Sequence, residues 1–137
     1  MLNLGWNVTF DGNCEEAFNF YEKNLGGKIK MMMTWGDSPM AKDVPKDWAK
    51  KITHGAITIG DQELTGSDSP GAHYQKPQGF SVILNTNDTS EAERVFKALA
   101  ENGATKMPLQ ETFWAQRFGM VTDRFGIPWM INCAKPS

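Results

Sequence analysis

The sequence predicts an α+β fold in which two copies of a βαβββ unit form a curved mixed sheet. Two observations lead to this prediction. A strand-then-helix pattern opens each half of the 137-residue chain, and the two helices match at an offset of 75 residues. Residues 16–17 are Glu-Ala, residues 91–92 repeat them, and Tyr21 likewise corresponds to Phe96. About three β-rich segments follow each helix and complete the unit.

The first helix has a start signal, an apolar face and a stop signal. Asn13 followed by Glu16 makes an Asn version of the capping box, in which side chains satisfy backbone N–H groups of the first turn. Gly26 and Gly27 predict its end, because glycine readily adopts the left-handed conformation of a helix cap. The predicted buried face comprises Ala17, Phe18, Tyr21 and Leu25.

Strand patterns surround this helix. Residues 4–10 predict the strand before it, and residues 29–35 predict the strand after it. Residues 36–48 contain two prolines and several charges, so we expect a long and mobile loop there. Residues 51–68 predict a hairpin that turns at Gly60-Asp61.

The second half repeats this order after a linker at 69–78 that contains Ser, Pro and Gly. Residues 79–88 predict a strand, and residues 88–106 contain the second helix. Its predicted buried face comprises Ala92, Val95, Phe96 and Leu99. The strands that follow are predicted at 105–109, 117–123 and 126–132, with a polar aromatic loop at 110–116 and a turn from Asp123 to Gly126. We therefore expect a single domain of two modules, at about 1–68 and 79–137.

Composition narrows the functional classes. Fourteen basic and 16 acidic residues give a net charge of −2, which offers no electrostatic footprint for nucleic acid or for an anionic membrane. No apolar run is long enough to span a bilayer, and the start of the chain lacks a targeting pattern, so we expect a cytoplasmic protein. Cys14 and Cys133 are expected to be small buried thiols, although a single bridge between them stays open.

A curved sheet can hold a ligand on the face that its helices do not cover. Side chains alternate between the two faces of a strand. Ile57 and Ile59 suit the helix side, which leaves His54, Ala56 and Thr58 for the concave side. One imidazole, one methyl group and one hydroxyl would make a credible pocket wall.

Three segments together resemble a known family. GNCEEAFNFYEKNLGG, THGAITIGDQELTGSD and LQETFWAQRFGMVTDRFGIPWMI occur in this order, and the chain is similar over nearly its whole length to the PhnB-like branch of glyoxalase/bleomycin-resistance domains. This branch of the vicinal oxygen chelate superfamily is also labelled demethylubiquinone methyltransferase-like. The resemblance implies a cup-like sheet, usually in a homodimer. In metal-dependent members it also implies a divalent ion that is held by His, Gln or Glu and polarises a substrate oxygen.

Of the four metal positions implied by the resemblance, three carry poor ligands or none here, and His54 is a good candidate ligand. The four positions fall at Trp6 or Asn7, at His54, at Phe80 or Ser81, and at Met130. A lone His54 does not hold a hard divalent ion against water, so we predict no metal cofactor. A divalent ion stays open if a partner subunit, or residues placed differently, supply the missing ligands.

Eight residues are predicted to contact a ligand: Asn7, Trp35, His54, Thr58, Trp114, Arg117, Trp129 and Met130. His54 is the candidate base or anion contact, with a structural histidine as the alternative. Trp114 and Arg117 suit a planar anionic ligand; the alternative is that Trp114 packs under its loop and Arg117 pairs with an acidic neighbour. Core packing is the alternative for Trp35, Trp129 and Met130.

Three functions follow from these residues. We favour a metal-independent binding module for a small aromatic or amphiphilic molecule. The second is an enzyme of lyase, isomerase or dioxygenase type that acts on a small oxygenated substrate, with His54 as base and Arg117 or Asn7 stabilising negative charge. The third is a divalent-metal enzyme. The sequence shows neither a Gly-rich nucleotide loop nor a Ser-His-Asp or Cys-His signature. The expected partners are a small molecule and a second copy of the chain, with no nucleic acid and no membrane.

Overall fold

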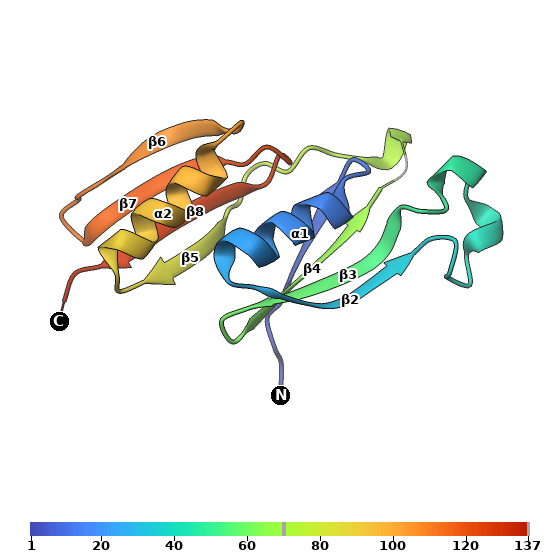
Figure 1. The fold of residues 1–137 in the computed structure, drawn as a ribbon, viewed down its shortest axis with the longest axis horizontal. Coiled ribbons are helices and arrows are strands. Elements are labelled where there is room, and N and C mark those ends of the chain that lie inside the picture. The colour runs from blue at the N-terminus through green and yellow to red at the C-terminus, as the bar shows by residue number, and fades with distance from the viewer. Residues whose placement is uncertain (70, 137) are drawn as a thin grey trace. The chain divides into compact units, whose positions relative to one another are not determined.

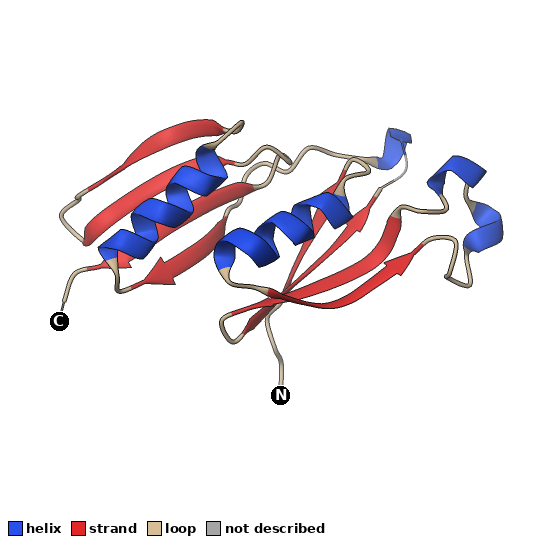
Figure 2. Cartoon of the chain, viewed as in Figure 1, coloured by secondary structure: helices blue, strands red, loops and turns tan. Residues whose placement is uncertain are grey.

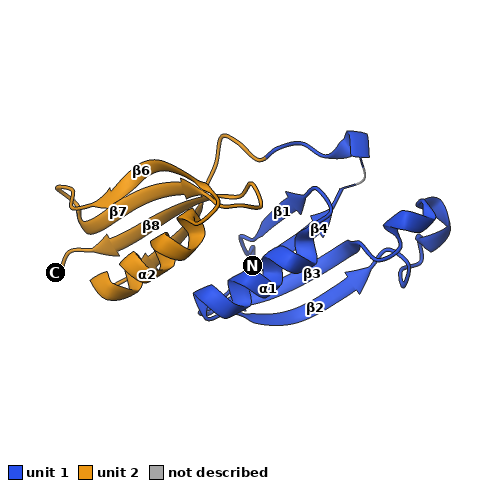
Figure 3. Cartoon of the chain, turned by 45° about the horizontal axis from the view of Figure 1, so that its top comes forward, with its two compact units in different colours: residues 1–76 blue, residues 77–137 orange. Residues whose placement is uncertain are grey.

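Two units with the same order of elements make up the computed structural model, which describes residues 1–69 and 71–136 (Figure 1). Unit 1 spans Met1–Lys76 and unit 2 spans Pro77–Ser137 (Figure 3). In each unit a helix packs on one face of a four-stranded mixed sheet (Figure 2). The predicted α+β fold of duplicated βαβββ units is confirmed.

Unit 1 follows the predicted order. Its elements are β1 (Trp6–Phe10), α1 (Cys14–Leu25), β2 (Lys28–Thr34), β3 (Ile52–Ile59) and β4 (Gln62–Asp68). The sheet order is β1-β4-β3-β2, in which β1 runs parallel to β4 and the other neighbours are antiparallel. Because β1 and β2 lie at opposite edges, α1 must cross the sheet between them, and it therefore covers one face.

Unit 2 repeats this topology. Its elements are β5 (Val82–Thr86), α2 (Thr89–Ala100), β6 (Ala104–Gln110), β7 (Ala115–Thr122) and β8 (Pro128–Ala134), in the order β5-β8-β7-β6. Phe80 and Ser81, which the sequence placed in the opening strand, precede β5. Within the predicted linker the structure shows a short 3-10 turn at Gly71–His73, and Pro70 lies outside the described residues.

Each unit has its own core between helix and sheet. The core of unit 1 includes Val8, Phe10, Phe18, Tyr21, Ile52 and Ile57, and that of unit 2 includes Ala92, Val95, Leu99, Val121, Trp129 and Ile131. Cys14 and Cys133 are both free and buried, as expected. Two residues predicted for the buried faces are only half buried: Leu25 because it ends α1, and Phe96 because it borders a groove between α2 and β6.

The start of α1 is held by a carboxylate that is 54 residues away in the sequence. The Cys14 backbone N–H donates to Asp68 Oδ1 at 2.9 Å, and the Ile52 backbone N–H donates to Asp68 Oδ2 at 2.8 Å. A negative charge at the N-terminal end of a helix also interacts favourably with the helix dipole. The predicted capping box is wrong: Asn13 makes no side-chain cap bond, and its buried Oδ1 finds no partner among the described residues. The long-range carboxylate takes over the capping role.

The loop at 36–48 is more ordered locally than its composition predicts. It contains 3-10 turns at Ala41–Asp43 and Lys46–Trp48. Its base is closed by the Trp35 N–H donating to the Lys51 carbonyl at 2.8 Å, and by the Gly36 N–H donating to the Ala49 carbonyl at 2.9 Å. These bonds join the two ends of the loop, so the content of proline and charged residues within it does not predict them.

The turn that the sequence predicts before β8 is organised by a second buried carboxylate. Asp123 Oδ1 accepts from the Phe125 and Ile127 backbone N–H groups at 2.9 and 3.0 Å. Asp123 Oδ2 accepts from Trp129 Nε1 at 2.8 Å, which ties the turn to the core of unit 2.

No helix within the described part of the chain is both long and apolar enough to cross a membrane.

Replacing Asp68 by Asn should destabilise the fold. An amide offers one acceptor oxygen, so one of the two bonded N–H groups would face an NH₂ group, at a cost of about 2–3 kcal/mol in the free energy of unfolding. Urea unfolding followed by circular dichroism measures this difference. Asp61→Asn, at the exposed hairpin turn, is the matched control and should change stability little. Equal stability of the two variants would contradict the role given to Asp68.

Stability should fall at alkaline pH through Cys14. Burial raises the pKa of the Cys14 thiol, and the Asp68 and Glu15 carboxylates raise it further. In the unfolded chain the thiol ionises at about pH 8.5. Below that pH the thiol keeps its proton in both states, so it does not reduce the free energy of unfolding. Above it the unfolded state loses protons that the native state keeps, so the free energy of unfolding falls by up to about 1.4 kcal/mol per pH unit. Urea unfolding across this range should show a smaller decline for Cys14→Ala than for the parent protein; identical declines would refute it.

Candidate functional site

The candidate site is the face of each sheet that its helix leaves bare, here called the helix-free face. A Cβ atom built on Gly55 of β3 would lie 3.3 Å from the Phe18 ring of α1, and Ile57 is fully buried. Because side chains alternate along a strand, the residues between them point the other way. His54, Ala56 and Thr58 therefore lie on the helix-free face, in the phase that the sequence predicts.

The helix-free face of unit 1 combines polar groups with methionine. Strand register aligns Asn7, Thr65, Ala56 and Met31 across all four strands. The Thr65 hydroxyl donates to Asn7 Oδ1 at 2.7 Å. Met31 and Met33, on β2, are 45% and 37% exposed.

His54 stands on this face beside Met33, its register partner on β2. The residue is exposed, and its imidazole makes no hydrogen bond or ion pair within residues 1–69 and 71–136. Both ring nitrogens are therefore available to a ligand.

The helix-free face of unit 2 is more apolar. Register places Ile83 beside Met130, Met130 beside Met120, and Met120 beside Met107. These four side chains, here called the methionine row, cross the whole sheet from β5 to β6. Ile83 is 53% exposed, and the three methionines are half buried.

A polar and aromatic row lies next to the methionine row. Register aligns Asn85, Asn132 and Phe118, and Asn132 Nδ2 donates to Asn85 Oδ1 at 3.1 Å. The Trp114 ring, 47% exposed, lies edge-on to the Phe118 ring with centroids 5.3 Å apart. Phe113 extends this aromatic cluster, because its ring centroid lies 4.7 Å from that of Trp114.

The structure places three predicted ligand contacts away from the helix-free faces. Trp129 is fully buried under α2, and Arg117 faces α2, where its Nε atom pairs with Glu93 Oε1 at 3.2 Å. Along their strands, Trp129 and Arg117 are each adjacent to a residue of the helix-free face. An error of one residue in the assumed alternation therefore assigns them to the wrong face. Trp35 is half buried after β2, and its Nε1 donates to the Asp68 carbonyl at 3.3 Å.

Five of the eight predicted contacts lie on or beside the helix-free faces: Asn7, His54 and Thr58 in unit 1, and Trp114 and Met130 in unit 2. Sequence reasoning missed Met31, Met33, Ile83, Met107, Phe118 and Met120. The alternation of Phe118, Met120 and Thr122 in β7 was an available signal. The register that aligns Met120 with two further methionines was not.

The donor set does not fit a resident metal ion. No group of three or more His, Cys, Asp or Glu side chains within the described residues is arranged to hold one. The register partner of His54 is Met33, whose thioether is a poor ligand for a hard divalent ion. We therefore derive no chemistry through a metal.

Comparison with known proteins identifies relatives of the whole chain. Residues 4–132 match the family model described as 3-demethylubiquinone-9 3-methyltransferase. The chain is 35% identical to protein YjdN of Escherichia coli (strain K12) in an alignment that is 136 residues long. The alignment covers 93% of this chain and 92% of that protein.

Solved structures show the same architecture. The crystal structure of protein PA1353 from Pseudomonas aeruginosa is similar with a TM-score of 0.89 and 45% identity, over 99% of this chain and all of that one. A putative 3-demethylubiquinone-9 3-methyltransferase, PhnB protein, from Bacillus cereus has a TM-score of 0.82 at 24% identity, over 97% of this chain and 100% of that one. A glyoxylase/bleomycin resistance protein/dioxygenase domain from Frankia sp. EAN1pec shares the fold, with a TM-score of 0.65 at 11% identity over 98% and 99% of the two chains.

Proposed function

The chain belongs to the 3-demethylubiquinone-9 3-methyltransferase family, and on that premise we propose that it is a small-molecule-binding protein of the glyoxalase/bleomycin-resistance type. It holds a small aromatic or amphiphilic ligand against the helix-free side of its sheets, and it does so without a metal ion. The observation that carries the proposal is the methionine row of unit 2.

The methionine row suits an apolar ligand for two reasons. Removing such side chains from water is favourable, at about 25 cal/mol per Å² of apolar surface. Unbranched thioether side chains also adapt to the shape of what they contact. Trp114 adds an aromatic face beside the row, against which a planar ligand can stack. The hydrogen-bonded Asn85 and Asn132 offer polar contacts that would orient the ligand.

The helix-free face of unit 1 would recognise oxygen-bearing groups. His54, Asn7 and Thr65 supply an imidazole, an amide and a hydroxyl on one face, next to the exposed Met31 and Met33. This mixture favours an amphiphilic ligand rather than a hydrocarbon.

The helix N-termini argue against binding of a nucleoside phosphate. Such ligands commonly use the free N–H groups at the start of a helix. In α1 the Cys14 N–H is bonded to Asp68, and in α2 the Ser90 and Glu91 N–H groups are bonded to Asp88. A carboxylate at each helix start repels a further anion. We therefore expect a ligand that places no phosphate group at either helix start.

The proposal includes a homodimer in the cytoplasm. Exposed apolar side chains at Leu2, Leu4 and Phe80 support association with a second copy. Two free cysteines support a reducing compartment.

N-Phenyl-1-naphthylamine, a neutral fluorescent aromatic probe, should bind saturably to the purified protein. Met120→Asn should weaken this binding about tenfold, because it places an amide in the middle of the methionine row. Probe fluorescence during titration measures the affinity, and EDTA should leave it unchanged.

Met40→Asn is the matched control, since Met40 is an exposed methionine in the 36–48 loop and should not contact the probe. Equal affinities of the Met120 and Met40 variants for the probe would contradict the proposed site. Loss of binding in EDTA would overturn its independence from metal.

The free imidazole of His54 favours a second candidate, an enzyme that uses His54 as a general base on a small oxygenated substrate. A screen of small oxo and hydroxy compounds by NMR should then find a compound that the protein turns over. His54→Gln should abolish that turnover, and His73→Gln, in the linker, should preserve it. Normal turnover by the His54 variant would rule this candidate out.

A further inference from the structure

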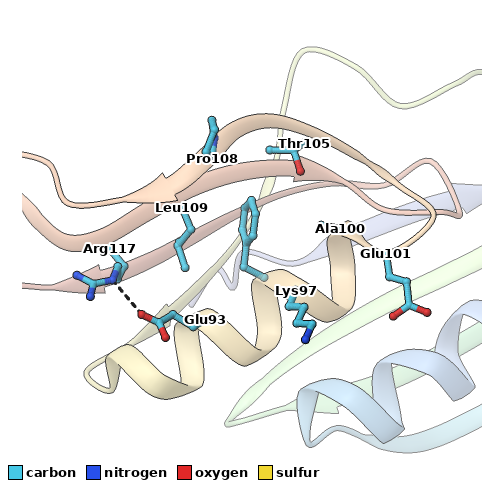
Figure 4. Close-up of a pocket in the computed structure, with 9 residues that line it drawn as sticks. Glu93, Lys97, Ala100, Glu101, Thr105, Pro108, Leu109 and Arg117 are labelled. Atoms are coloured by element: carbon cyan, nitrogen blue, oxygen red, sulfur yellow. Dashed lines mark hydrogen bonds and ion pairs between the residues drawn. The ribbon is translucent and has the colours of Figure 1, made fainter.

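A groove of about 700 Å³ lies on the helix-covered side of unit 2, between α2 and the strands β6 and β7 (Figure 4). Phe96, Ala100, Pro108 and Leu109 supply its apolar lining. Charged side chains border it: Glu93, Lys97, Glu101 and Arg117. The groove lies on the opposite side of the sheet from the methionine row, so the proposed function does not use it.

The helix position that Glu93 occupies in unit 2 carries a buried aromatic ring in unit 1. At the 75-residue offset between the helices, Glu93 corresponds to Phe18. Phe18 is fully buried, and its ring packs against β3 and β4, where Cβ atoms built on Gly55 and Gly66 would lie 3.3 and 2.8 Å from it. In unit 2 a carboxylate that is 57% exposed replaces this ring. The helix position that carries a buried ring in unit 1 therefore carries a partly exposed carboxylate at the border of the groove in unit 2.

Glu93 orients an arginine at the end of the groove. Arg117 Nε donates to Glu93 Oε1 at 3.2 Å, and Arg117 Nη1 donates to the Gln116 carbonyl at 2.7 Å. Arg117 Nη2 has no partner within residues 1–69 and 71–136. The guanidinium is thus held in place with one nitrogen free to bind an acceptor.

A second cation stands on the same border. Lys97 lies one helical turn after Glu93, and its ammonium group has no acceptor in the part of the chain that the structure describes. Glu101, a further turn along, already pairs with Arg124 at 3.8 Å. Both acidic side chains at the border are thus paired with arginines, and the charged groups that can still bind a ligand, Lys97 and Arg117 Nη2, are positive.

At the floor of the groove, the Phe96 ring packs directly against a strand. Phe96 packs over Gly119 of β7, where an added Cβ atom would lie only 2.7 Å from Phe96 Cε2. The absence of a side chain at Gly119 lets the ring sit against the strand, with the groove beside it.

The β6 edge is unsuited to pairing with another strand. Pro108 has no N–H to donate, and the register of β6 against β7 shifts twice, between Thr105 and Met107 and between Met107 and Gln110. The backbone of an extended peptide, or of a second copy of the chain, could not form a continuous row of hydrogen bonds along β6. This favours a small molecule as the occupant.

We propose that this groove binds a small amphiphilic carboxylate. Its apolar chain or ring lies on Phe96 and Leu109, and its carboxylate accepts from Arg117 Nη2, with Lys97 adding positive charge at the border. A planar guanidinium matches a carboxylate better than any other anion-binding side chain does.

Octanoate is the test probe, and isothermal titration calorimetry with amide NMR spectra measures its binding. We expect saturable binding that shifts resonances of α2 and β6, and that weakens about tenfold in Arg117→Gln through loss of a charge-assisted bond. Arg94→Gln, on the same helix but outside the groove, is the matched control and should retain affinity. Gly119→Ala should also weaken binding, because its methyl group displaces the Phe96 ring into the groove.

Three further outcomes separate this site from the proposed function. Met120→Asn should retain octanoate affinity, and octanoate should not displace N-phenyl-1-naphthylamine. No saturable octanoate binding, or equal affinity of Arg117→Gln and Arg94→Gln, would overturn the proposal. Resonances of α2 and β6 that shift with protein concentration, and not with octanoate, would show instead that a second copy covers the groove.

Discussion

The buried carboxylate of Asp68 is the interaction on which unit 1 depends, because it joins the end of β4 to the starts of α1 and β3. It ends β4, and its two oxygens hold the first amide of α1 and the first amide of β3. An unpaired carboxylate would be costly in this place, and here both oxygens are satisfied. By accepting from the first amide of α1, Asp68 holds the start of the helix that covers one face of the sheet.

Unit 2 reaches the same topology with other carboxylates. Asp88 caps α2 locally, through N–H groups two and three residues ahead, and Asp123 ties the turn before β8 to Trp129. The two units thus share the arrangement of strands and helix but not the contacts that stabilise it. Duplicated folds can diverge in this way because topology requires only that buried polar groups be paired, whichever residue pairs them.

The divergence produces two surfaces of different chemistry on opposite sides of the second sheet. The helix-free face carries methionines and aromatic rings, which suit an apolar or amphiphilic ligand. The helix-covered face carries a groove in which Glu93 takes the place that Phe18 fills in unit 1. Exchanging a buried ring for a carboxylate gives up apolar packing, and in return it orients Arg117. The residue at this helix position therefore differs in role between the units: Phe18 packs in the core of unit 1, and Glu93 orients an arginine at the border of the groove in unit 2.

The sequence by itself determined the features that depend on neighbours along the chain. Periodicity placed both helices and their duplication, glycine and aspartate placed the turns at Gly60 and Asp123, and strand alternation put His54 on the helix-free face. Only the tertiary structure decided the features that depend on pairing across the sheet. The cap of α1 comes from Asp68, 54 residues away, and the methionine row exists because the register aligns Met130 with Ile83 and Met120. The side on which Arg117 and Trp129 lie also became clear only there, since a shift of one residue in the assumed alternation moves a side chain to the other face.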